Sequence, residues 1–181
     1  MEIVHPIRCT SDIERMKAAL SKNPRDLLMF IIGINSGLRI SDILPLRVDQ
    51  VRGQTELTIR EGKTGKTKTF RFNQAIIDAA AELIPNGAAD SDYLFPSRKA
   101  GRPISRVQAY RILSGAARDS GVTDSIGCHS LRKTFGYHAY KAGVDLSLLQ
   151  SIFNHAAQDV TLRYIGITQD KIDDVYAAIN L

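Results

Sequence analysis

The chain has 181 residues, of which 44% are hydrophobic, and a formal net charge of +5, so it can bury one hydrophobic core but hardly two. Its basic balance, with a pI near 9.3, favours a polyanionic partner such as nucleic acid, although charge gives only a direction. The longest apolar run, Leu27 to Ile34, is far shorter than the roughly 20 residues of a membrane span, and Met1-Glu2 does not begin a signal segment, so a cytoplasmic protein without a membrane partner is expected.

The first part of the chain predicts two helices and a short helical piece. Ser11 has capping-box spacing with the acidic residue three positions later, and spaced apolar residues continue to about Leu20, which predicts a first helix. Pro24 suits the first turn of a second, buried helix, and Gly37 is a natural C-terminal stop. A short helical piece is expected over Ile40 to Leu44.

The remainder predicts a β-hairpin followed by helices. Glu56–Arg60 and Lys66–Phe72 have extended patterns and are joined by a turn that contains glycine. The expected fold is α+β, mostly helical with a small antiparallel β-sheet, in a single domain over residues 1–181. Helical spacing recurs in five later segments separated by Pro, Gly and Asn breaks, namely Gln74–Leu83, Arg106–Ser120, Ser130–Ala142, Leu146–Asn154 and Lys171–Ile179.

The turn of the hairpin contains two Gly-Lys-Thr triplets, at 62–64 and 65–67, which superficially suggest the end of an ATP-binding loop. That motif needs another glycine five positions before its Gly-Lys pair, but Leu57 and Arg60 stand at those positions, and a strand follows where a helix is needed. The preferred interpretation is a hairpin tip that presents Lys63 and Lys66 outward, with a solvated charged turn as the plain alternative.

Several charged residues are placed to bind an anion. Arg39 and Asp42 are three residues apart and so lie on one face of the short helix. An ordinary surface ion pair, which contributes about a few tenths of a kcal/mol to stability, explains this spacing equally well. His129 and Arg132 lie at the start of the helix predicted over Ser130–Ala142, on a side away from its apolar residues. Each of these positions is weak evidence alone.

Two more candidates lie at the end of the chain. Asp145 can cap the helix that starts at Leu146, and Asn154 suits the left-handed position at its C-terminal end. His155 would then project from a turn, although a lone histidine is more often a surface or core residue. Only its distance from His155 distinguishes Tyr164 from the other tyrosines considered, Tyr110, Tyr137, Tyr140 and Tyr176.

Taken together, five short motifs resemble the ordered motif set of the tyrosine recombinase, or phage integrase, family. They occur in the family's order, with typical gaps near the C-terminal end, and the resemblance extends from about Thr10 over nearly the whole chain. It implies the family's catalytic domain and an activity in site-specific DNA recombination. The motifs are Gly37-Leu38-Arg39, Lys63-Thr64-Gly65, His129-Ser130-Leu131-Arg132, Asn154-His155 and Thr161-Leu162-Arg163-Tyr164.

The resemblance implies roles for the matched charged residues. Arg39 and Arg132 correspond to the two arginines that clamp the scissile phosphate, and Lys63 to the hairpin lysine that protonates the leaving 5′ oxygen. Asp42 falls where the family usually has an acidic residue that supports the first arginine. Guanidinium groups match the non-bridging oxygens of a phosphate and can replace metal ions in phosphoryl transfer, so no cofactor or metal is expected.

The resemblance also implies the nucleophile and its neighbours. Tyr164 corresponds to the nucleophile, His129 to the His or Lys of the HxxR motif, and His155 to the second histidine; Asn154 departs from the family, where Gly is commoner. A free tyrosine has a pKa of about 10, so only roughly one in a thousand is ionised near pH 7. Either histidine can assist as a base, which such a nucleophile needs.

The implied partner is double-stranded DNA. The family adds a homotetramer on paired DNA sites, in which the closing helix from Lys171 exchanges between protomers, and a monomer is possible without DNA. The alternative for this helix is that its apolar side packs on its own domain. The protein would then be cytoplasmic and nucleoid-associated when bound to DNA. The alternatives are a type IB topoisomerase-like nicking-closing enzyme that uses the same tyrosine, and a catalytically idle DNA-binding regulator on the same scaffold.

Most members of the family carry an N-terminal core-binding domain as well. Too little sequence precedes Thr10 to hold such a domain. The expectation is therefore either an isolated catalytic domain from a longer protein or a naturally short recombinase. Cys9 and Cys128 lack CxxC spacing, which excludes a zinc ribbon and makes a disulfide between them unexpected.

Overall fold

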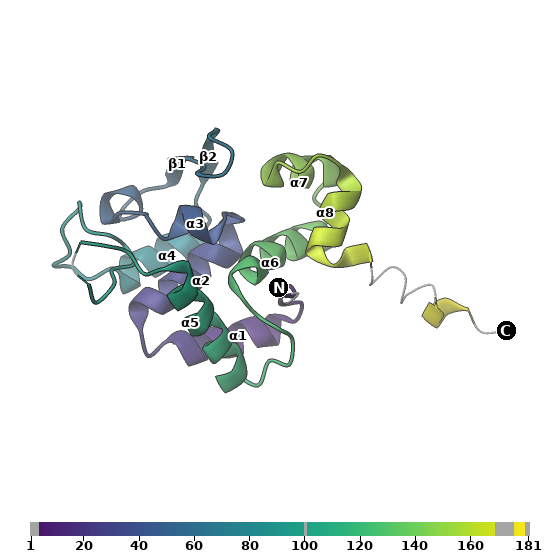
Figure 1. Cartoon of the computed structure of the whole chain (residues 1–181), viewed down its shortest axis with the longest axis horizontal. Coiled ribbons are helices and arrows are strands. Elements are labelled where there is room, and N and C mark those ends of the chain that lie inside the picture. The colour runs from purple at the N-terminus through teal and green to yellow at the C-terminus, as the bar shows by residue number, and fades with distance from the viewer. Residues whose placement is uncertain (1–3, 100, 169–175, 180–181) are drawn as a thin grey trace.

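The computed structural model describes residues 4–99, 101–168 and 176–179, and Figure 1 shows how its elements are arranged. Helices dominate, and two antiparallel strands form a small sheet, so the expected α+β, mostly helical fold is confirmed. In chain order the elements are α1 (Thr10–Leu20), α2 (Pro24–Ser36), α3 (Ile40–Ile43), the 3₁₀ turn η1 (Val48–Gln50), β1 (Glu56–Arg60), β2 (Thr67–Arg71), α4 (Gln74–Leu83), α5 (Arg106–Asp119), α6 (Cys128–Lys141), α7 (Leu146–Phe153) and α8 (Gln158–Ile165).

Helix α2 is the centre of the fold and packs against α1, α3, α4 and α6. Its long apolar run buries the helix on most sides, as the sequence predicts. Pro24 occupies its first turn, and Gly37 follows its end in the left-handed conformation with a φ of 62°. Glycine is needed there for a second reason, because a Cβ on Gly37 would lie 2.6 Å from the Phe135 ring of α6. The end of α2 is therefore in close contact with α6.

The β1–β2 hairpin projects from the upper edge of the molecule in Figure 1. The two strands are antiparallel, with Glu56 opposite Arg71. The second strand, Thr67–Arg71, is one residue shorter at each end than the expected Lys66–Phe72. Leu57 and Ile59 are buried and alternate with exposed residues along β1. One face of the hairpin therefore packs on the body of the molecule, as the two-residue period of a strand requires.

Helices α6, α7 and α8 pack together beside this body, on the right of Figure 1. Tyr137, Phe153, Ile165 and Ile167 form their shared apolar cluster. A Cβ on Gly136 of α6 would lie 2.6 Å from both Phe153 and Ile165. The three helices come this close because residue 136 has no side chain.

The two ends of α7 have the predicted local chemistry. The carboxylate of Asp145 accepts hydrogen bonds from the backbone N–H groups of Ser147 and Leu148, so it caps the helix. Asn154 follows the helix in the left-handed conformation, with φ 53° and ψ 47°. Both predicted ends are confirmed, and His155 lies in the turn between α7 and α8.

The start of the chain and its end differ from the expectations. Helix α1 begins at Thr10 after the N-cap Cys9, without a side-chain cap, so the predicted capping box at Ser11 is wrong. Ser11 already lies inside the first turn, where its hydroxyl contacts the Cys9 sulfur at 3.1 Å. Most of the expected closing helix, Lys171–Ile179, lies outside the described residues. In its described part, residues 176–178 are helical.

Two further differences concern the C-terminal half. Helix α6 begins at Cys128 instead of Ser130, so His129 is inside its first turn. The eight-residue helix α8 was not predicted as a helix, because so short a segment shows little periodicity. Cys9 and Cys128 are both free thiols in the structure. Among the described residues, no helix is long and apolar enough to cross a membrane.

We predict that Gly136→Ala destabilises the protein by about 1 to 3 kcal/mol, because the added methyl group overpacks the contact of α6 with Phe153 and Ile165. The measurement is urea unfolding followed by circular dichroism. The matched control is Gly115→Ala in α5, where the nearest atom to a new Cβ is 4.0 Å away, and a gain of up to about 1 kcal/mol is expected from helix propensity. Equal stability changes for the two variants would contradict the packing argument.

Candidate functional site

The buried guanidinium of Arg132 connects two parts of the fold. Its side chain extends from α6, only 2% of the residue is exposed, and it donates to the carbonyl oxygen of Gly37 at 2.7 Å and to that of Phe153 at 2.8 Å. The guanidinium carbon also lies 4.6 Å from the centre of the Phe153 ring. Burial lowers the pKa of Arg132, but an arginine in a protein stays protonated. The site therefore contains a fixed positive charge of defined orientation.

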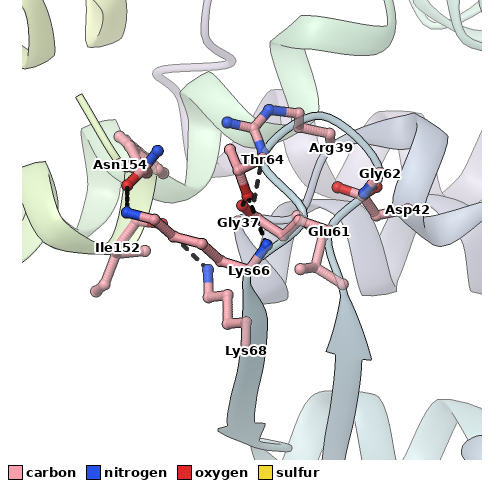
Figure 2. A network of polar contacts seen from close by, with 12 residues as sticks. Gly37, Arg39, Asp42, Glu61, Gly62, Thr64, Lys66, Lys68, Ile152 and Asn154 are labelled. Atoms are coloured by element: carbon pink, nitrogen blue, oxygen red, sulfur yellow. Dashed lines mark hydrogen bonds and ion pairs between the residues drawn. The ribbon is translucent and has the colours of Figure 1, made fainter. Parts of the chain in front are cut away.

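The second guanidinium, that of Arg39, lies at the start of α3 and pairs with a buried carboxylate. Arg39 Nη1 lies 3.0 Å from Glu61 Oε1, at an angle that leaves this nitrogen without a hydrogen bond to any described residue. The Thr64 hydroxyl donates to the other oxygen of Glu61 at 2.7 Å, and Figure 2 shows this group of side chains. Although burial alone would raise it, the pKa of Glu61 is lowered by the Thr64 hydrogen bond and by the charge of Arg39. Arg39 is thus held by an ionised partner.

Asp42, which the sequence predicts to support Arg39, is buried on α3 and accepts a hydrogen bond from the backbone N–H of Gly62 at 3.1 Å. The ion pair of Arg39 is made by Glu61, which the sequence analysis did not select. One signal was available: Leu57, Ile59 and Glu61 are two residues apart, so a carboxylate continues the buried face of a strand. A buried carboxylate needs a partner. A role of Asp42 in supporting Arg39 stays a prediction.

Tyr164 on α8 lies among the histidines. Its ring centre is 5.1 Å from that of His155 and 5.7 Å from that of Phe153. The phenol oxygen lies 3.5 Å from Nδ1 of His129, at the outer limit of a hydrogen bond. Burial raises the pKa of Tyr164, and the nearby charges of Arg132 and Arg39 only partly oppose this. Without a bound ligand the phenol is therefore protonated near pH 7.

Both histidines of the site are shifted toward their neutral forms. Partial burial lowers the pKa of His155, and the charges of Arg132, Arg39 and Lys63 lower it further. Partial burial and the neighbouring charges, of which Lys133 is the largest, have the same effect on the pKa of His129. Because an ordinary histidine titrates near about 6.5, both rings are neutral at pH 7.

The orientation of His155 depends on Thr161, another residue that the sequence analysis assigned no role. His155 Nδ1 lies 3.0 Å from the Thr161 hydroxyl, whose oxygen is 3.5 Å from the Ala157 carbonyl oxygen. If the hydroxyl donates to that carbonyl, the proton of the neutral ring is on Nδ1, and Nε2 has a free lone pair. The buried Thr161 lies one turn before Tyr164 on α8, which is the signal in the sequence that indicates it.

The tip of the hairpin adds lysines to the site. Lys63 is exposed at the tip, and its charge acts on His155. Lys66 Nζ donates to Oδ1 of Asn154 at 2.9 Å, and Lys68 Nζ donates to the carbonyl of Ile152 at 3.1 Å (Figure 2). The two contacts join the hairpin to the C-terminal end of α7.

The structure therefore brings together all six residues that the sequence selects as catalytic. Hydrogen bonds, ring contacts and mutual electrostatic effects connect them around the tip of the hairpin and the ends of α6, α7 and α8. Within the described ranges, no group of three or more His, Cys, Asp or Glu side chains is placed to hold a metal ion. Permanent guanidinium charges beside a tyrosine and two neutral histidines suit phosphoryl transfer to a protein hydroxyl. The six are Arg39, Lys63, His129, Arg132, His155 and Tyr164.

Comparison with known sequences identifies relatives that are similar over almost the whole chain. The chain is 45% identical over 177 residues to the probable integrase/recombinase YoeC of Bacillus subtilis, and the match covers 97% of each protein. It is 28% identical over 160 residues to the tyrosine recombinase XerA of Pyrococcus furiosus, with 87% of this chain and 55% of XerA covered. The chain thus spans nearly all of YoeC and about half the length of XerA.

Solved structures share the fold. A crystal structure of XerA recombinase superimposes with a TM-score of 0.77 at 20% identity and covers 99% of this chain and 68% of that chain. The XerH site-specific recombinase, solved with its difH substrate in a post-cleavage complex, has a TM-score of 0.71 at 19% identity and covers 98% of this chain and 54% of its own. The model of the phage integrase family matches residues 10–171. The chain therefore belongs to the phage integrase family, and it is an integrase/recombinase enzyme of the tyrosine recombinase type.

Proposed function

We propose that Tyr164 cleaves one strand of duplex DNA by attacking a backbone phosphate. The bond from the phenol oxygen to phosphorus forms as the bond from phosphorus to the 5′ oxygen breaks, which leaves a 3′-phosphotyrosyl ester. The phenol proton passes to a neutral histidine, His155 or His129, and the ammonium of Lys63 gives a proton to the departing 5′ oxygen. The observation that carries this proposal is the position of Tyr164 between the two histidines.

The guanidinium groups stabilise the charge that develops at the phosphate. Arg132 is held by two backbone carbonyls and Arg39 by Glu61, so neither needs to reorganise when the phosphate becomes more negative. Since burial raises the pKa of Tyr164, the attack requires both the base and these charges. Removing a single preorganised donor of this kind typically slows catalysis about 100- to 1,000-fold.

The covalent step makes strand exchange reversible. Because the phosphotyrosyl ester retains the energy of the broken DNA bond, a 5′-hydroxyl of another strand can attack it and release Tyr164. Neither ATP nor a metal takes part in this scheme. Joining of different duplexes distinguishes recombination from the nicking and closing of one duplex by a topoisomerase-like enzyme.

We propose a homotetramer on paired DNA sites as the active assembly, with a monomer in the absence of DNA. XerH was solved bound to its difH substrate, and the Tn1549 transposon integrase with transposon right end DNA. In this chain, Tyr176 and Ile179 near the C-terminus are 78% and 60% exposed. Such large exposed apolar side chains fit a contact with a second copy, in which the C-terminal segment is exchanged between protomers.

Tyr164→Phe is expected to abolish covalent protein–DNA adducts while DNA binding stays within about twofold, because only the nucleophilic oxygen is lost. The assay uses a nicked suicide substrate with a candidate site, followed by a denaturing gel. Tyr140→Phe on α6 is the matched control and should form the adduct at the wild-type rate. An adduct formed equally by Tyr164→Phe would remove Tyr164 from the mechanism, and no adduct from the wild-type protein would favour an idle DNA-binding regulator.

The rate of adduct formation is expected to rise with pH to a plateau, and the midpoint of the rise should lie below about pH 6.5, the ordinary pKa of histidine. The pKa values of His155 and His129 in the free protein lie below their ordinary value, and only the neutral ring, which dominates above the pKa, can accept the phenol proton. The measurement is the single-turnover rate at subsaturating DNA between about pH 5 and pH 8. His155→Gln and His129→Gln tell which ring causes the acid limb, and a rate that falls over this range contradicts a histidine base.

Replacing both Tyr176 and Ile179 by alanine is expected to leave the stability of the free protein unchanged, because both side chains are exposed. Complexes on paired DNA sites should contain fewer than four protomers as the exchanged contact is lost. Mass photometry of the protein with and without DNA measures both states. Four protomers per complex for the double variant would contradict the exchange of these side chains.

A further inference from the structure

The tip of the β1–β2 hairpin is held on one flank by α3. Glu61 pairs with Arg39, and the backbone N–H of Gly62 donates to Asp42. The tip itself is tightly turned, because the Gly65 N–H donates to the Glu61 carbonyl at 2.8 Å. These contacts fix the segment that carries Lys63 relative to the first arginine.

The other flank of the tip is held by the end of α7. Lys66 Nζ donates to the side-chain oxygen of Asn154 at 2.9 Å, although the two residues are 88 apart in sequence. Lys68, two residues later on β2, donates to the Ile152 carbonyl (Figure 2). Carbonyls at the C-terminal end of a helix attract cations. The hairpin therefore spans from α3 to α7 with Lys63 between the two attachments.

Asn154 does more than end α7. Its φ is 53°, and no other non-glycine residue in the described part of the chain has a positive φ. Glycine adopts this conformation at lower cost, so the backbone alone does not require asparagine. What asparagine adds is an acceptor, and Lys66 uses it. Asn154 also directly precedes His155.

We propose that Lys66 and Asn154 are positioning residues, whose hydrogen bond holds the hairpin tip against the α7–α8 turn and fixes Lys63 relative to His155. The inference rests on the proposed function, because it assigns to these residues the alignment of the proton donor Lys63 with the rest of the site. Lys63 lies three residues before Lys66 in the tight tip, and His155 follows Asn154 directly. A break in the bond lets the tip move away from the site.

The main rival is that Lys66 simply contacts a DNA phosphate. The two explanations differ in the salt dependence of binding, because each lost phosphate contact lowers the slope of log K against log salt by about 0.9. If Lys66 acts through Asn154, Lys66→Met leaves this slope unchanged. A slope reduced by about one indicates a phosphate contact and overturns the proposal.

The central experiment is a double-mutant cycle on the rate of covalent adduct formation with the nicked substrate. Lys66→Met and Asn154→Gly are each expected to slow cleavage about fivefold, the size of one partly exposed charged hydrogen bond. The double variant should be no slower than either single variant, since both remove the same contact. Arg71→Met is the matched control: it removes an exposed positive charge from the same hairpin and should cleave at the wild-type rate. Multiplying effects in the double variant, or wild-type rates in the single variants, overturn the proposal.

A second substrate tests whether the effect passes through Lys63. When sulfur replaces the bridging 5′ oxygen at the cleaved phosphate, the leaving group is a thiolate, whose conjugate thiol has a pKa of about 8.5, so it departs without a proton donor. Lys63→Met and Lys66→Met should both approach the wild-type rate on this substrate. A fivefold defect of Lys66→Met that persists with sulfur overturns the assignment to Lys63.

Hydrogen exchange separates this inference from the proposed function. In the free protein, Lys66→Met and Asn154→Gly should speed amide exchange in residues 61–66, and Arg71→Met should not. Unchanged exchange in both variants overturns the proposal that the Lys66–Asn154 hydrogen bond holds the hairpin tip against α7, even when the wild-type protein cleaves DNA. If the wild-type protein forms no adduct, the proposed function fails, while the exchange data still decide whether the hydrogen bond holds the tip.

Discussion

The buried guanidinium of Arg132 is the interaction on which the rest of the site depends. It donates to the carbonyls of Gly37 and Phe153, which precede Arg39 and His155 by two residues each. A buried charge is stable only when its donors are satisfied, so the ends of α2 and α7 must stay where these carbonyls meet α6. Gly136 permits this arrangement, because any side chain there would push Phe153 and α8 away.

Burial divides the ionisable groups of the site into two kinds. The pKa of Tyr164 is raised and those of His129 and His155 are lowered, mainly by burial, so these three groups are neutral near pH 7. The guanidinium groups remain charged, and of the two only Arg39 has a carboxylate within ion-pair distance among the described residues. The free site is consequently cationic and protonated at the nucleophile, a state that suits the arrival of a phosphate.

Much of the local structure followed from the sequence because its causes are local. The glycine after α2, the aspartate before α7 and the asparagine after it each indicate a helix end by their own conformational chemistry. The hairpin and the buried second helix follow from alternation and from an apolar run. Helix α8 was missed since eight residues hold little periodicity, and the capping box at Ser11 failed because α1 already begins at Thr10, with Cys9 as its N-cap.

The sequence by itself determined which residue types are available for the chemistry and, through their order, the family to which the chain belongs. Only the tertiary structure decided which groups meet: Glu61 pairs with Arg39, Thr161 orients His155, and Lys66 reaches Asn154 across 88 residues. Such pairings depend on the packing of segments that are distant in the chain. Neither propensity nor periodicity contains that information, because both describe the interactions of a residue with its own neighbours in sequence.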